Sequence, residues 1–229
     1  MGFADRLEQT NAVIAALRAD LWESPVVSQR LIHVDYGAEH IVPKEVHAII
    51  RFIYTETTRH IKFAPDFFVV DKRCPERTYL LEYKCTQTPL YSRNRIEMIR
   101  EKSPRKEIDW QDIGQWEAEA YDNYQALAKL GIRVVILNYC AYHDRLLVCD
   151  FVQRVTPLHR DQVRLTTTRG SRTPFINFDL NTMRSLEEFL VAEHDFDIEQ
   201  VKPLCANVKQ RLQIELPVTH HPRSPLYGG

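Results

Sequence analysis

The sequence has few of the residues and motifs that mark several large protein classes. Its 229 residues include only seven glycines, and the absence of G-x-x-x-x-G-K-[ST] excludes a P-loop nucleotide hydrolase. The G-x-S-x-G pattern of serine hydrolases is also missing. No apolar run is long enough to span a bilayer, and the N-terminal segment carries acids where a secretion signal carries basic residues. We therefore expect a soluble, cytoplasmic protein.

Cysteine is scarce and unpatterned. The five cysteines are odd in number and form no C-x-x-C pair, and three lie in apolar runs, at positions 85, 140 and 149. This usage predicts buried free thiols in a reducing compartment and not a disulfide framework. The nine histidines show no zinc-ligand spacing with the cysteines, so no zinc site is expected.

Charge of one sign is not in excess. The formal net charge is −1, from 30 basic and 31 acidic residues, so the total gives no support for a nucleic-acid partner. A locally basic groove on a neutral body is still compatible with such a partner. With 44% hydrophobic residues the chain can form a sizeable core. We expect one domain over residues 1–217 and a disordered tail, rich in Pro, Gly and His, over 218–229.

Hydrophobic periodicity predicts an α/β fold, with a central mixed β-sheet and helices on both of its faces. Helical spacing, caps and prolines indicate helices over residues 4–22, 43–60, 112–131, 181–196 and 197–214. Apolar, β-branched runs indicate strands over 67–70, 78–85, 132–143, 145–155 and 174–180. Residues 88–110 read as a charged loop with a short helix. Gly131 is expected to end the third helix, and Asn181 or Thr182 to cap the fourth.

Three charged residues stand at the edge and in the middle of the expected central hairpin. Asp66 opens the strand 67–70, while Glu82 and Lys84 lie inside the apolar strand 78–85. Because strand side chains alternate, Glu82 and Lys84 share one face of the sheet. Buried charges are costly unless they are paired, so this placement requires a physical reason.

Two interpretations of these charges remain open. Glu82 and Lys84 can form a purely structural ion pair. Alternatively, Asp66 and Glu82 converge and bind a hard divalent cation such as Mg²⁺, which binds proteins through one or two carboxylates. Lys84 would then orient a water molecule or offset charge on a phosphate, as metal-assisted phosphodiester hydrolysis requires.

The order Pro65-Asp66, then Glu82-Tyr83-Lys84, resembles the PD-(D/E)xK phosphodiesterase superfamily, the restriction-endonuclease-like nucleases. The setting is similar as well: a helix, the Asp at a strand start, E-x-K in an apolar strand, then a helix and a further strand. The resemblance covers roughly residues 43–150. It implies a restriction-endonuclease-like core.

The resemblance also implies roles for individual residues. Asp66 and Glu82 would bind Mg²⁺, for which Mn²⁺ substitutes, with the backbone carbonyl of Tyr83 as a further ligand. Lys84 would assist the attacking water or the transition state, and cleavage would leave a 5′-phosphate and a 3′-hydroxyl. A further glutamate comes from the preceding helix in many members, for which Glu45 is the first match and Glu56 the second. Glu45 fits a solvated first-turn residue equally well.

The helix after E-x-K often carries a polar group facing the site in this superfamily. Gln115, Glu119 and Asn123 recur at four-residue spacing, which places them on one face of the expected helix, and Gln115 is the candidate. A solvated helix face explains the same stripe. The aromatic residues of this segment, Trp116, Tyr121 and Tyr124, are expected in the core and not as platforms for bases.

Two basic segments are candidates for phosphate contacts with DNA. The residues concerned are Arg93, Arg95, Lys102, Arg105 and Lys106 in the first segment and Arg164, Thr168, Arg169, Ser171 and Arg172 in the second. A solvated surface explains such runs more often than a ligand does.

The compact size favours a Mg²⁺-dependent, site-specific type II restriction endonuclease that cuts double-stranded DNA as a homodimer. Repair, recombination, phage or defence nucleases of the same superfamily are the nearest alternatives. A nucleic-acid-binding member without catalysis and an unrelated α/β protein with a structural ion pair complete the set.

Overall fold

A computed structural model describes residues 3–37, 55–87, 113–150 and 175–216, together with a few single positions between 42 and 53. The helical elements are α1 (Phe3–Leu17), the π-helix η1 (Arg18–Trp22), α2 (Pro25–Ser28), α5 (Glu56–Lys62), η2 (Pro75–Arg77), α7 (Ala118–Lys129), η3 (Ala141–His143), η4 (Leu180–Thr182), α10 (Leu186–His194) and α11 (Ile198–Glu215). The strands are β1 (Leu31–Asp35), β2 (Phe67–Asp71), β3 (Tyr79–Thr86), β4 (Ile113–Glu117), β5 (Val134–Cys140), β6 (Arg145–Asp150), β7 (Phe175–Asp179) and β8 (Arg184–Ser185).

A mixed sheet of six strands forms the centre of the fold, in the order β1-β2-β3-β5-β6-β8. Strands β3 and β5 are parallel, and the other neighbours are antiparallel. The expected hairpin of β2 and β3 is therefore confirmed, with β3 in the interior of the sheet. Strand β1 was not expected, because only Leu31 of its five residues is fully buried and the apolar signal of an edge strand is weak.

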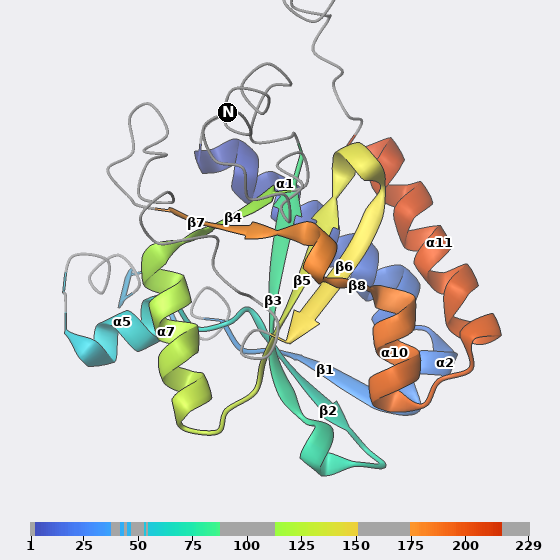
Figure 1. Cartoon of the computed structure of the whole chain (residues 1–229), viewed down its shortest axis with the longest axis horizontal. Helices are drawn as coiled ribbons and strands as arrows, with labels where there is room; N and C mark the ends of the chain where they lie inside the picture. Colours follow the sequence, from blue (N-terminus) through green and yellow to red (C-terminus); the bar gives the residue numbers. More distant parts are fainter. Residues whose placement is uncertain are drawn as a thin grey trace, which may run out of the picture.

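Two layers cover the sheet, and the side-chain parity of β3 separates them. Tyr79, Leu81 and Tyr83 belong to a hydrophobic cluster shared with α1, α10 and α11. Leu80 belongs to a second cluster shared with α7 and the β4–β7 pair. Figure 1 shows α7 and the β4–β7 pair on the left and α10 and α11 on the right. The predicted α/β class, a central mixed sheet with helices on both faces, is confirmed.

The helix expected over 112–131 is shorter than predicted. Residues 113–117 form strand β4, which pairs with β7, and α7 starts only at Ala118. Pairing with a distant strand overrides the local helical spacing here. The end of the helix is as expected: Gly131 has a φ of 78°, and its N–H donates to Ala128 O while Ile132 N–H donates to Leu127 O. This is the Schellman arrangement that favours glycine.

Two other helix starts differ from the predictions. Helix α5 precedes Asp66 and starts at Glu56 behind a Thr55 cap, so the helix predicted over 43–60 does not run without a break up to residue 60. Helix α10 is capped by Ser185, whose hydroxyl accepts the Glu188 N–H at 3.2 Å, and not by Asn181 or Thr182. Residues 181 and 182 lie in the 3₁₀ turn η4, because β8 must pair with β6 before α10 begins.

All five cysteines are free, as predicted. Cys140, Cys149 and Cys205 are buried, whereas Cys74 and Cys85 are only half-buried. Among the described residues no helix combines the length and the apolar character that crossing a membrane requires. The expected loop over 88–110 and the tail over 218–229 lie outside the described residues.

Candidate active site

Asp66 and Glu82 lie side by side at the start of the hairpin. Phe67 is paired with Leu81 and Phe68 with Leu80, so Asp66, the residue before β2, comes close to Glu82. The charge of Asp66 acts on both Lys84 and Tyr124, as that of Glu82 does. The backbone holds Asp66 in this position, because its carbonyl accepts N–H groups from Tyr36 (3.0 Å) and Gly37 (2.8 Å).

Lys84 forms an ion pair and a hydrogen bond with Glu82 on the same face. The Glu82 side chain is only 7% exposed and that of Lys84 is 29% exposed. A carboxylate this deeply buried, in the interior of a sheet, is costly without compensation. Lys84 provides part of that compensation.

Tyr83 anchors the site from the opposite face. Its N–H donates to Asp66 Oδ2 at 2.9 Å, which ties the two strands together at the acid. Its buried hydroxyl accepts a hydrogen bond from Trp22 Nε1 (2.6 Å) and lies 3.0 Å from His33 Nε2. Burial raises the pKa of Tyr83 well above its ordinary value, so the hydroxyl stays neutral. The segment that carries Glu82 and Lys84 is thereby held rigidly.

Two side chains near these residues were not predicted as site residues. Tyr124, on α7, is 1% exposed and hydrogen-bonds to Glu82. Glu117, the residue before α7, is half-buried, and its charge acts on both Tyr124 and Lys84. Tyr124 was correctly predicted in the core, but its polar contact has no sequence signature. Glu117 was not considered because the helix was predicted to start at residue 112, before it. Gly114, a residue that is unfavourable inside a helix, was the available signal against that start.

The charges of the cluster determine the state of Lys84. Burial lowers the pKa of Lys84, but the carboxylates of Glu82, Asp66 and Glu117 outweigh this effect and raise the pKa above its ordinary value. Lys84 is therefore a cation at neutral pH. The three acids and one lysine give the group a formal net charge of −2.

The donor chemistry of this group suits a hard divalent cation. Among the described residues, no group of three or more His, Cys, Asp or Glu side chains is assembled to hold a metal ion. Mg²⁺ needs fewer ligands from the protein, because it keeps several waters and uses one or two carboxylates together with substrate phosphates. Asp66 and Glu82 are the residues that would hold it, and the net charge of −2 favours its binding.

Gln115 does not lie where the sequence predicted. It is on strand β4, paired with Asn177 of β7, and so it shares no helix face with Glu119 and Asn123. Asn123 is fully buried, where its side-chain amide donates to Phe63 O at 2.7 Å and contacts His60. Glu119 lies 4.0 Å from Lys62. The predicted polar stripe on one helix is wrong.

Of the two candidates for a further glutamate, Glu45 is exposed. Glu56 is the first residue of α5 and lies 3.9 Å from Arg59 on the same helix. All ten predicted DNA-contacting residues, from Arg93 to Lys106 and from Arg164 to Arg172, lie outside the described residues.

Comparisons with known proteins give little further information. No protein-family model matches the sequence, and no curated protein matches it significantly. Among solved structures, the chain is similar to D212, a nuclease from a fusselovirus, at 13% sequence identity and a TM-score of 0.40. The similarity covers 86% of this chain and 95% of the viral one. At this TM-score the likeness supports no conclusion about function.

Proposed function

We propose that the protein is a divalent-cation-dependent nuclease with a restriction-endonuclease-like core. One observation carries the proposal: Asp66, Glu82 and Lys84 lie together on a rigid central hairpin, where the charges of both carboxylates act on the Lys84 ammonium. A purely structural ion pair needs only Glu82 and Lys84. A structural ion pair does not explain why a third charged residue, Asp66, lies close to Glu82, the most buried of the three.

The chain contributes position and charge to the reaction. A divalent cation held by Asp66 and Glu82, with the Tyr83 carbonyl as a further ligand, supplies electrostatic stabilisation of the phosphate undergoing hydrolysis. Mg²⁺ is the proposed cation and Mn²⁺ its substitute. Lys84, kept cationic by its neighbours, orients the attacking water or offsets the charge that develops on phosphorus oxygens. The products are a 5′-phosphate and a 3′-hydroxyl.

Within this class we favour a type II restriction endonuclease that acts on double-stranded DNA as a cytoplasmic homodimer. The support for this finer proposal is the compact chain and the family resemblance of Asp66, Glu82 and Lys84. Two copies related by a two-fold axis would match the symmetry of a palindromic site. Repair, recombination and phage or defence nucleases use the same kind of site on the same kind of core.

Incubation of the protein with plasmid DNA and Mg²⁺ or Mn²⁺ tests the proposal. Discrete fragments are expected from a restriction endonuclease, whereas a smear indicates a nonspecific nuclease and corrects the finer proposal. Binding without cleavage under both cations would instead indicate a nucleic-acid-binding member without catalysis. Cleavage that persists in EDTA would contradict the role of the cation.

A further inference from the structure

A second polar site lies at the other end of β2, away from the carboxylates. A pocket of about 360 Å³ is bounded by α2, the end of β2 and the junction of α10 with α11. Asp66 precedes β2 and Arg73 follows it, so the five residues of β2, roughly 17 Å of strand, lie between the two sites. Figure 1 shows this end of the sheet, beside α2 and α10, at the lower right.

Arg30 forms the inner wall of the pocket and is fixed on several sides. It is 6% exposed, its Nη2 donates to Asp195 Oδ2 at 3.2 Å, and its Nε lies 3.8 Å from Asp71 Oδ2. The guanidinium also stacks over the ring of Phe196, 5.2 Å from its centre. A buried cation held this firmly loses little conformational entropy when it binds an anion.

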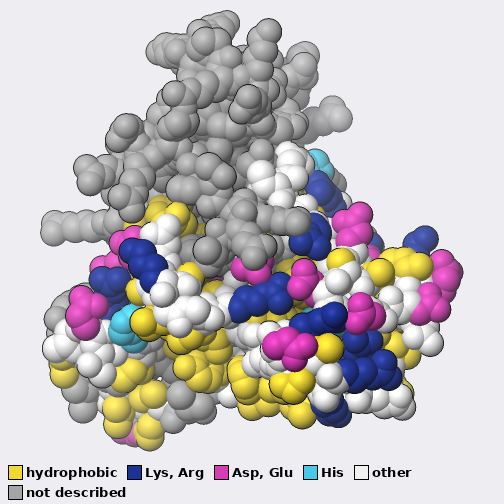
Figure 2. Space-filling view, turned by 60° about the horizontal axis from the view of Figure 1, so that its bottom comes forward, with side chains coloured by type: hydrophobic (Ala, Val, Ile, Leu, Met, Phe, Trp, Pro, Cys, Tyr) yellow, Lys and Arg dark blue, Asp and Glu magenta, His cyan; other side chains and the backbone are white. Residues whose placement is uncertain are grey.

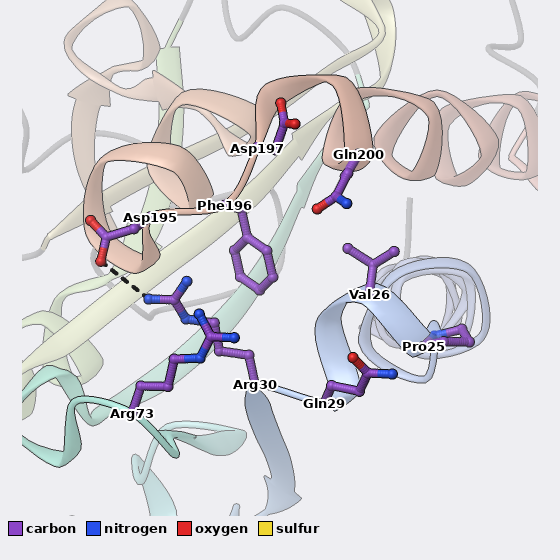
Figure 3. A pocket seen from close by; sticks show the side chains of 9 residues that line it. All are labelled: Pro25, Val26, Gln29, Arg30, Arg73, Asp195, Phe196, Asp197 and Gln200. Atoms are coloured by element: carbon purple, nitrogen blue, oxygen red, sulfur yellow. Dashed lines mark hydrogen bonds and ion pairs between the residues drawn. The ribbon is translucent and has the colours of Figure 1, made fainter.

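Arg73 extends into the same pocket from the loop after β2. Figure 3 shows its side chain pointing toward the guanidinium of Arg30, beside Phe196. Arg73 is exposed, and only its backbone N–H has a hydrogen bond, to Asp71 Oδ1 at 2.9 Å. Its guanidinium makes no ion pair or hydrogen bond with any residue in the part of the chain that the structure describes. Two guanidinium groups therefore converge, and only Arg30 has a carboxylate partner.

The acidic residues of the pocket are already engaged. Asp195 accepts hydrogen bonds from Arg30 and, at 2.7 Å, from Arg77, and these contacts hold the pKa of Asp195 below its usual range. Asp197 caps α11 by accepting the Glu199 N–H at 3.0 Å. Figure 2 shows Lys and Arg interspersed with Asp and Glu over the right-hand part of this end of the molecule. Positive and negative side chains are mixed around the pocket, so it suits a single anionic group and not a long polyanion.

The remaining walls suit the organic part of a ligand. Figure 3 shows the Phe196 ring facing Val26 across the pocket, with the amide side chains of Gln29 and Gln200 beside them. The Phe196 ring and the two guanidinium groups lie on one side of the pocket, and Val26 and the two amides lie on the other. A volume of about 360 Å³ is within the range of small-ligand sites.

We propose that this pocket binds a nucleotide through its phosphate, with Arg73 and Arg30 holding the phosphate oxygens and Phe196 and Val26 contacting the nucleoside. The paired N–H donors of an arginine side chain match two oxygens of a phosphate, which favours a phosphate as the bound anion. The phosphate belongs either to a free nucleoside monophosphate or to the 5′ end of a strand. The proposal is independent of catalysis at Asp66.

Calorimetric titration in EDTA tests the pocket without any contribution from metal-dependent cleavage. We expect deoxyadenosine 5′-monophosphate to bind, deoxyadenosine not to bind, and inorganic phosphate to compete. Arg73→Gln should weaken binding about 10-fold or more, because a charge-assisted hydrogen bond is lost. Arg73→Lys keeps the positive charge but loses the paired N–H donors of the guanidinium. Its affinity for the nucleotide should lie between those of the natural protein and Arg73→Gln.

Lys202→Gln is the matched control, since Lys202 is an exposed cation on α11 that does not line the pocket. It should bind within about twofold of the natural protein. A 5′-phosphorylated oligonucleotide compared with its 5′-hydroxyl form separates the two sources: a preference for the former assigns the pocket to strand ends, and equal binding assigns it to free nucleotides. Nucleotide binding that Arg73→Gln leaves unchanged, or no binding of either phosphate ligand, would overturn the proposal.

Discussion

The two faces of strand β3 have different compositions and, in our account, different roles. Tyr79, Leu81 and Tyr83 point into an almost entirely apolar layer with α1, α10 and α11. Glu82 and Lys84, their neighbours in the chain, point to the other face, where the charge of Asp66 also acts on Lys84. The first face shields the interior from water and fixes the strand, and the second presents charges at fixed positions. Catalytic groups need such rigid support, because small displacements of reacting atoms are costly.

The largest effect should come from the charged face. Asp66→Asn keeps an oxygen that can accept the Tyr83 N–H but removes the charge, and Lys84→Ala removes the ammonium. Each should lower the rate of DNA cleavage about 1000-fold or more, because transition-state charge is left unbalanced. Initial rates on plasmid DNA measure this, with melting temperature as the check on folding.

Lys209→Ala is the matched control for Lys84→Ala. Its side chain is 30% exposed and lies 3.7 Å from Glu187, so exposure and partner type are similar, but it is on α11. Cleavage should remain within about twofold of the natural rate. Equal losses in Lys84→Ala and Lys209→Ala would mean that Lys84 is structural.

The next effect belongs to the apolar face. Leu81 is 1% exposed and adjacent in sequence to Glu82. Leu81→Ala should reduce the free energy of unfolding by about 2–5 kcal/mol through the cavity it leaves. Cleavage per folded molecule should change little. Urea denaturation measures the stability, and Ile214→Ala, at a position 75% exposed, should cost less than about 0.5 kcal/mol.

A buried ionisable pair on the apolar face, His194 with Asp71, should make stability depend on pH. His194 Nδ1 lies 2.8 Å from Asp71 Oδ2, and both side chains are fully buried. Burial, more than the opposing effect of Asp71, holds the pKa of His194 below its usual 6.5. As the pH falls through about 6.5, the unfolded chain takes up a proton before the folded one does, so stability is lost.

Asp71 affects the stability only at lower pH. Burial raises its pKa, but the bonds from His194 and from the N–H groups of Arg73 and Cys74 outweigh burial and lower the pKa below 3.8. Stability from Asp71 is therefore lost only below about pH 3.8. Melting temperature should fall between pH 7.5 and 5.5, with a smaller slope in His194→Gln. An unchanged slope in that variant would contradict the assignment.

The smallest effect on cleavage should come from the hydrogen bond between Tyr124 of α7 and Glu82 of β3. Tyr124→Phe removes a buried hydroxyl that bonds Glu82 and should lower the cleavage rate about 10-fold, through misplacement of the carboxylate. Tyr121→Phe is the control on the same helix, since its hydroxyl accepts from Gln125 at 2.7 Å. Equal rates in the two variants would assign Tyr124 to packing alone.

The sequence was sufficient to predict the hairpin, because apolar runs bounded by turns and the placement of Asp66, Glu82 and Lys84 are local signals. It was sufficient for the end of α7, because Gly131 adopts the positive φ that a helix end favours. It failed at β4 and β1, which exist through pairing with β7 and β2, far away in the sequence. The same failure concealed Glu117, while the contacts of Tyr124 and Arg73 depend on packing between distant segments.

Crystals soaked in Mn²⁺ test most directly whether a divalent cation binds between Asp66 and Glu82. We predict an anomalous scattering peak in contact with both carboxylates in the natural protein, and its loss in Asp66→Asn. Carboxylates that point apart, with no peak at a Mn²⁺ concentration that supports DNA cleavage, would contradict the central claim.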